Sequence, residues 1–168
     1  MYTTYNTEAL FIEKKIKDKD ALLLVFTKDL GLLYVFAIGV LKEKAKLKHL
    51  IEPGSLATVS LIKGKNRWIL KGVENHKKIL KDFQSQAVFF RFVKNLIPQE
   101  QKEEELFEYL IKILSSPMQS REIILNKMLK ILGYSNKSTE ELLSLPEKNR
   151  LEVIQKLLQE TQIINDIL

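Results

Sequence analysis

The sequence contains no cysteine and only two histidines, His49 and His76, among its 168 residues. The lack of cysteine excludes a disulfide framework, a zinc ribbon and thiol catalysis, and it is typical of a protein in a reducing compartment. Neither histidine has a second histidine or a carboxylate at the spacing of metal ligands. We therefore expect no metal site, no cofactor and a cytoplasmic location.

Signatures of catalysis are also missing. Gly64-Lys65 resembles the end of a phosphate-binding loop, but that loop needs Gly and then Ser or Thr where this chain has Val59 and Asn66. No Gly-x-Ser-x-Gly elbow occurs. We expect no catalytic residues, no small-molecule substrate and no enzymatic activity, with an enzyme of unknown type as a distant alternative.

Long apolar runs are absent too. The longest uncharged apolar stretch, residues 30–41, is shorter than the roughly 20 residues that a membrane-spanning helix needs. Residues 1–6 have no positive region ahead of an apolar run, so no signal peptide is predicted. We expect a soluble protein with no membrane partner.

Positive charge is concentrated in the first half of the chain. Residues 1–80 hold 15 Lys and Arg against 8 Asp and Glu, whereas residues 81–168 hold 12 against 13. The net charge of +6 therefore comes entirely from the first half. This asymmetry predicts an N-terminal unit that faces a polyanion, with nucleic acid the commoner partner and an anionic membrane surface the rarer one.

Hydrophobic patterning also changes near residue 80. Before it, short apolar runs are separated by turn residues, at 9–12, 22–27, 32–38, 56–62 and 68–73. Five short strands predict a small closed or nearly closed β-barrel. After residue 80 the apolar residues recur at helical spacing. The predicted fold class is α+β with segregated halves, a barrel domain at 1–80 and an all-helical domain at 81–168.

A basic loop lies between the third and fourth predicted strands. Its four lysines alternate with other residues: Lys42, Lys44, Lys46 and Lys48. In extended backbone, alternate side chains point the same way, about 6.5–7 Å apart, which is near the spacing of single-strand phosphates. The loop is thus either a track for a nucleic-acid backbone or a solvated loop that keeps the protein soluble. Lys65 and Arg67 mark a second basic turn, which favours the track.

Aromatic side chains can stack on unpaired bases. Tyr34 and Trp68 are the best candidates on the predicted strands, although core packing is the commoner fate of a residue such as Trp68. Three phenylalanines follow the barrel on the first predicted helix, and we expect them to seal the interface between barrel and helices: Phe89, Phe90 and Phe92.

The residues resemble the bacterial recombination mediator family RecO. Segments in the family's order carry the resemblance: Tyr2-Thr3-Thr4, Phe26-Thr27-Lys28-Asp29-Leu30-Gly31, Ala37-Ile38-Gly39, Leu50-Ile51-Glu52-Pro53 and Met128-Leu129-Lys130-Ile131-Leu132-Gly133-Tyr134. The resemblance implies an OB-fold barrel followed by a helical domain. It also implies binding of single- and double-stranded DNA, strand annealing, and work with RecR and the single-strand-binding protein to load RecA at the nucleoid.

The resemblance places DNA contacts at the basic loop, with Lys65 and Arg67 matching the family's basic turn. Two departures stand out. Many relatives carry zinc-binding cysteines after the Leu-Gly-Tyr segment, whereas this chain resembles a short form without them. Relatives often have basic residues on the third strand where this chain has Tyr34 and Ile38, so Tyr34 is a candidate for stacking on DNA instead.

Two other functions stay open. The barrel could serve as a protein-interaction adaptor in which DNA binding is weak, a hypothesis that Ile38 and the missing zinc module favour. It could also bind RNA, because basic barrels of this kind serve both nucleic acids.

Overall fold

The computed structural model describes residues 3–42, 46–79, 83–115 and 121–160. Its first half is a closed barrel of five strands: β1 (Thr4–Lys17), β2 (Asp20–Thr27), β3 (Gly31–Ala37), β4 (Ser55–Lys63) and β5 (Trp68–Lys78). Around the barrel the order is β1-β2-β3-β5-β4, and only β3 and β5 run parallel. The predicted barrel is therefore confirmed as an OB-like ring.

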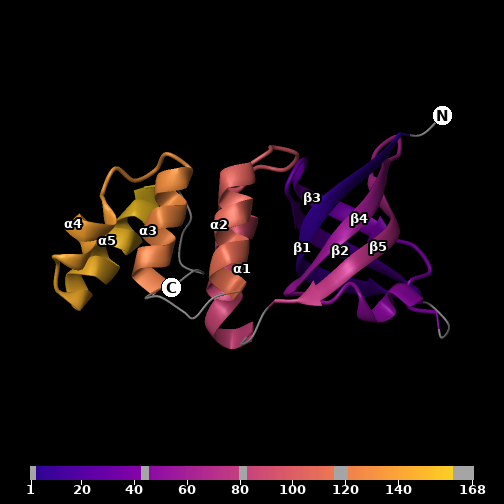
Figure 1. Cartoon of the computed structure of the whole chain (residues 1–168), viewed down its shortest axis with the longest axis horizontal. Coiled ribbons are helices and arrows are strands. Elements are labelled where there is room, and N and C mark those ends of the chain that lie inside the picture. Colours follow the sequence, from indigo (N-terminus) through magenta and orange to yellow (C-terminus); the bar gives the residue numbers. More distant parts are fainter. Residues whose placement is uncertain (1–2, 43–45, 80–82, 116–120, 161–168) are drawn as a thin grey trace.

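The second half of the described chain is helical. Its helices are α1 (Phe83–Leu96), α2 (Glu104–Ser115), α3 (Arg121–Ile131), α4 (Thr139–Leu143) and α5 (Glu147–Glu160). Figure 1 shows α1 and α2 standing against the barrel, with α3, α4 and α5 beyond them. Among the described residues, no helix is both long enough and apolar enough to cross a bilayer.

The barrel interior is filled by alternate residues of each strand. On β4, Ala57, Val59 and Leu61 are buried inside the barrel, whereas Thr58 and Ser60 are partly exposed on the outside. Ile51, from the segment before β4, is fully buried in the same cluster. Strand alternation therefore gives the barrel a core of its own.

A second core lies outside the barrel, between its strands and the helices. Leu10, Phe26 and Leu32 point outward from β1, β2 and β3 and are almost completely buried. They pack in one cluster with three phenylalanines of α1, which confirms the predicted interface: Phe89, Phe90 and Phe92. This shared core holds the helices against one side of the barrel.

The connection from α1 to α2 packs closely on the start of β3. The backbone N–H of Glu100 donates a hydrogen bond to the carbonyl of Leu32 at 3.0 Å. Gly31 has a φ of +78°, and a Cβ at this position would collide with the backbone of Gln101. Glycine is required there both for its left-handed conformation and for this close approach.

β1 is longer than the sequence predicts. The apolar runs at 9–12 and 22–27 leave residues 13–20 outside the predicted strands, but β1 continues to Lys17 and turns into β2 after only two more residues. A bulge between Phe11 and Glu13 separates the buried part of the strand from this extension. Lys15, Ile16 and Lys17 are all exposed, so alternation could not reveal the strand there.

An ion pair joins the barrel to α1 at the edge of the shared core. Lys94 Nζ lies 2.7 Å from a carboxylate oxygen of Glu13. The hydrogen bond from Lys94, opposed by partial burial, lowers the pKa of Glu13 below its ordinary value. The same hydrogen bond raises the pKa of Lys94.

These shifts predict a pH dependence of stability. Because the pKa of Glu13 is lowered on folding, its contribution is complete above the ordinary carboxyl pKa and is lost as the pH falls through the lowered value. The raised pKa of Lys94 affects stability only at alkaline pH, where the stability that Lys94 contributes is lost as the pH rises through its raised pKa. Glu13→Gln should therefore lose less stability between pH 6 and pH 3 than wild type, by less than about 1 kcal/mol for this partly exposed pair. Urea unfolding at both pH values measures this, and equal losses would contradict it.

Candidate nucleic-acid interface

An apolar row crosses the outer surface of the barrel where the helices do not cover it. Strand register places four outward side chains side by side: Leu22 on β2, Phe36 on β3, Ile69 on β5 and Ile62 on β4. All four are half-buried and lie outside both core clusters. The neighbouring outward pairs, Leu24 with Tyr34 and Phe26 with Leu32, belong to the shared core instead. The helices thus leave this apolar row open.

Two hollows lie over the row. The larger, of about 730 Å³, is lined by the β1–β2 turn, Leu22, Phe36 and the segment after β3. The smaller, of about 590 Å³, is lined by the β4–β5 turn, Ile62 and Ile69. Arg67 lines both, so the hollows adjoin at this residue. We call the two hollows together the barrel groove.

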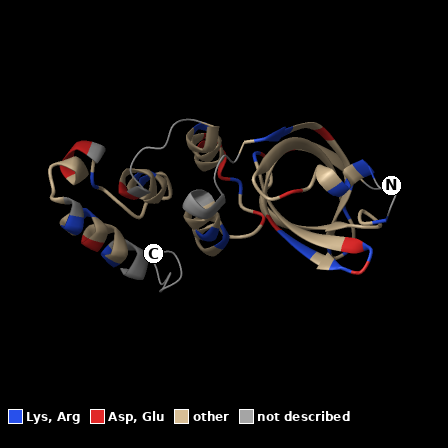
Figure 2. Ribbon diagram, turned by 90° about the horizontal axis from the view of Figure 1, so that it is seen from below, with Lys and Arg blue, Asp and Glu red and all other residues tan. Residues whose placement is uncertain are grey.

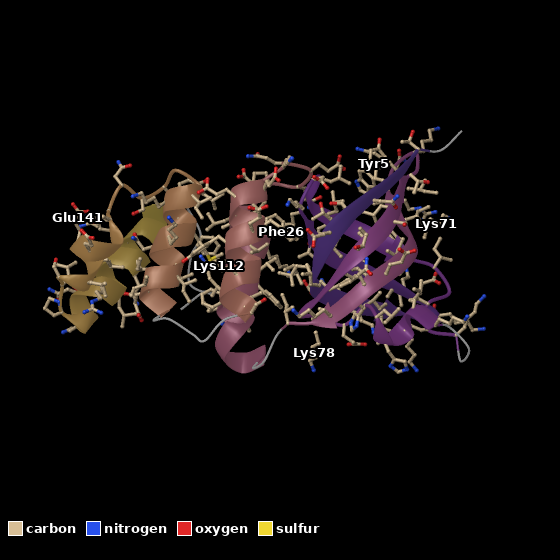
Figure 3. The ribbon with its side chains drawn as sticks, viewed as in Figure 1. Tyr5, Phe26, Lys71, Lys78, Lys112 and Glu141 are labelled. Atoms are coloured by element: carbon tan, nitrogen blue, oxygen red, sulfur yellow. The ribbon has the colours of Figure 1, made fainter. Side chains whose placement is uncertain are left out.

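Positive charge dominates the rim of the barrel groove. Six cations line it, namely Lys17, Lys19, Lys42, Lys65, Arg67 and Lys71. Two acids line it as well, and Asp20 already accepts a hydrogen bond from the backbone N–H of Gly39 at 2.6 Å. Figure 2 shows basic residues spread around the barrel, and Figure 3 shows Lys71 on the side away from the helices. An open apolar floor with a cationic rim suits a ligand that carries both flat apolar groups and negative charge.

Arg67 stacks on Phe36 where the hollows meet. Its guanidinium carbon lies 5.2 Å from the centre of the Phe36 ring, within the range of a cation–π contact. The side chain of Arg67 is exposed, as expected for a residue of the tight β4–β5 turn. The Phe36 ring therefore lies at the groove with the planar guanidinium of an exposed side chain over it.

A third hollow, of about 270 Å³, lies beside Phe36 toward the α1–α2 connection. The Glu100 carboxylate accepts hydrogen bonds there from Lys63 Nζ at 2.5 Å and from Trp68 Nε1 at 3.2 Å. The hydrogen bond from Lys63, followed by that from Trp68, lowers the pKa of Glu100. Trp68 is buried in the barrel core, which confirms the core-packing interpretation of this residue.

The part of the predicted lysine track that the structure describes is not extended. Lys42 lies in a turn after β3 and lines the larger hollow, whereas Lys44 lies outside the described residues. Lys46 and Lys48 lie in a 3₁₀ helix, Lys46–His49, so the prediction of extended backbone is wrong there. With three residues per turn, side chains two positions apart point in different directions.

The physical reason for this helix is a contact with the barrel. Leu47 and Leu50 pack on the barrel core, and a hydrogen bond from the Leu50 N–H to the Leu47 carbonyl closes the turn. Lys46 and Lys48 are exposed, but they do not line either hollow of the barrel groove. Of the three loop lysines that the structure describes, it therefore brings Lys42 to the groove.

The other predicted residues have different surroundings. Lys65 and Arg67 are exposed in the β4–β5 turn and line the barrel groove. Tyr34 is half-buried, packs against the shared core and lines the third hollow, so its stacking on DNA stays a prediction. Sequence reasoning missed Phe36, although strand alternation places it on the same face as Tyr34.

No family model matches the chain. A search of curated proteins finds a match in Caldanaerobacter subterraneus subsp. tengcongensis that is 25% identical over 142 residues. The chain is distantly similar to the DNA repair protein RecO. The match covers 76% of this chain but only 58% of that RecO, so the chain spans under two thirds of its relative. This RecO-like chain has no cysteine with which to bind zinc. Among the described residues, no three His, Asp or Glu side chains gather as a metal site requires.

Proposed function

We propose that this chain is a non-enzymatic, DNA-binding recombination mediator in homologous-recombination repair. It binds single- and double-stranded DNA and anneals complementary strands. The observation that carries this proposal is the barrel groove, an uncovered apolar row with a rim of six cations on an OB-like ring. The distant similarity to a DNA repair protein supports it.

Binding is mainly electrostatic in this mechanism. The rim cations take the place of counterions on the phosphates, and the release of those counterions drives association. Such contacts are blind to base sequence, as a protein that acts on any damaged site needs. Neutralised strands repel each other less, which favours pairing of complementary strands.

The proposed division of labour assigns DNA to the barrel domain, residues 1–80, and partner proteins to the helical domain, residues 81–168. The partners are RecR and the single-strand-binding protein, with which the chain helps to load RecA in the cytoplasm, at the nucleoid. The shared core supports this division, because the helices occupy one side of the barrel and leave the groove open on another. A partner on the helices and DNA in the groove can thus be bound together.

Anisotropy of a labelled oligo-thymidine, titrated with protein at several salt concentrations, tests the proposal. Three to six phosphate contacts should give a log-log slope between about −2 and −4, since each contact on a single strand contributes about −0.7. A duplex of the same length should also bind with a negative slope. No binding of either DNA at low salt would overturn the mediator function.

A protein-interaction adaptor is the second candidate, and exposed apolar residues favour it. Ile38 lines the larger hollow and is 60% exposed, and Ile16 near the β1–β2 turn is 67% exposed. Firm RecR association with weak DNA binding would support the adaptor. An oligo-uridine titrated beside the oligo-thymidine addresses RNA binding, because tighter binding of the uridine strand would assign the groove to RNA.

A further inference from the structure

Phe36 occupies an unusual position for a phenylalanine. It is the last residue but one of β3, and the strand alternation turns its side chain out of the barrel. The residues that face the same way earlier on β3, Leu32 and Tyr34, are covered by the shared core. Phe36 is half-buried and belongs to neither core. Its ring therefore has an apolar surface that the fold itself does not use.

Neighbouring strands hold the Phe36 ring from both sides. Leu22 on β2 and Ile69 on β5 are its cross-strand partners, and both are outward and half-buried. These neighbours flank Phe36 along the row, and the Arg67 guanidinium lies over the ring at 5.2 Å from its centre. A rigid ring with one face toward a groove is a stacking platform.

The surroundings of this platform match the dimensions and charge of a nucleotide chain. A hollow lies on each side of Arg67, and each has the volume of a pocket for a small molecule. Lysines line both hollows: Lys17, Lys19 and Lys42 in the larger, Lys65 and Lys71 in the smaller. A strand that crosses β2, β3, β5 and β4 thus meets cations before and after Phe36.

We propose that Phe36 and Arg67 form a base-stacking subsite for an unpaired base of a single strand. In this proposal the exposed Arg67 side chain moves off the Phe36 ring, the base stacks on the ring face that it leaves, and the guanidinium covers the other face of the base. This inference rests on the proposed DNA binding of the groove and names the form of DNA that the subsite takes. In a duplex both faces of each base are already stacked, so duplex DNA gains only the phosphate contacts.

Phe36→Leu tests the subsite, because leucine keeps an apolar side chain on the row but removes the ring. The variant should bind oligo-thymidine about 5- to 150-fold more weakly, the range that corresponds to stacking of one base. Its affinity for a duplex of the same length should change by less than about twofold, and its salt slope should equal that of wild type, since stacking releases no counterions. Phe36→Trp should keep single-strand affinity, because a larger ring stacks at least as well.

Tyr5→Leu provides the control. Tyr5 is an exposed aromatic on the same barrel, packed edge-on against Trp68, and it does not line the groove. This variant should bind single strands as wild type does. The subsite would be overturned if Phe36→Leu lost equal affinity for single strands and for duplex, or lost no affinity for either. If wild type bound neither DNA, the proposed function itself would fail instead.

A measurement on the unaltered protein covers the case in which Phe36→Leu does not fold. An oligonucleotide with 5-iodouracil in place of thymine forms photo-cross-links to an aromatic side chain that stacks on it. Mass spectrometry of the cross-linked peptides should place the attachment at Phe36. Attachment only at other aromatic residues would overturn the subsite while leaving DNA binding by the groove intact.

Discussion

Phe26→Ala is expected to lower the free energy of unfolding by about 3–5 kcal/mol. Phe26 is completely buried on the outer face of β2, and its ring meets Phe107 of α2 edge-to-face at 5.4 Å between centroids. Figure 3 shows it between the barrel and the helices. The substitution removes both the buried ring and the aromatic contact, and it leaves a cavity in the shared core. Such a loss is a large part of the 5–15 kcal/mol that stabilises a typical domain.

Urea unfolding followed by far-UV circular dichroism measures this loss. Ile16→Ala is the matched control, because it removes an apolar side chain that is 67% exposed at the end of the barrel. The control should lose less than about 0.5 kcal/mol, as surface substitutions usually do. A loss in Phe26→Ala as small as that of the control would contradict the shared core.

The second large effect is expected on DNA affinity when three groove cations are removed together. The variant Lys42→Ala, Lys65→Ala, Arg67→Ala should bind single strands about 100-fold more weakly at about 0.1 M salt, since one phosphate contact contributes about fivefold under these conditions. Its salt slope should become less steep by about 2. Removal of Arg67 also removes the guanidinium that covers the stacked base, so the loss can exceed the electrostatic part.

Two control variants test whether position or overall charge matters. Replacing three exposed lysines of the helices by alanine changes the net charge equally but leaves the groove intact: Lys112, Lys127 and Lys130. This control should lose less than about threefold. Lys46→Ala with Lys48→Ala should also have a small effect, because the 3₁₀ helix places these residues off the groove. If replacing Lys46 and Lys48 lowered single-strand affinity as much as replacing Lys65 and Arg67, DNA would bind along the basic loop and not in the barrel groove.

The strands and helices could be predicted because each rests on a local pattern. The alternation in residues 56–62 gives the buried face of β4, and the helical spacing after residue 80 gives the helices. Ser138 and Glu141 form a capping box at the start of α4, a pattern that is local in the sequence. Gly133 follows α3 with a φ of +80°, the left-handed conformation in which glycine commonly ends a helix.

Other features depend on contacts between distant segments. The 3₁₀ helix at Lys46–His49 forms because Leu47 and Leu50 reach the barrel core, which the lysine alternation does not reveal. Likewise, the sequence shows that Tyr34 and Phe36 share a face, but only the position of the helices decides that Tyr34 is covered and Phe36 is open. Lys65 and Arg67 were predictable as a pair because one tight turn holds both.

The closure of the barrel between β3 and β5 is its shortest ladder. Two residue pairs join these strands, Val35 with Trp68 and Phe36 with Ile69, whereas β2 and β3 are joined by seven. Local opening of a fold begins where the fewest contacts resist it, so this seam is where the ring is expected to part first. Phe36 and Arg67 lie on opposite sides of the seam. A DNA strand bound between them would contact both sides of the seam. Because it binds the closed ring, it would by mass action make opening of the ring rarer in the DNA-bound protein than in the free protein.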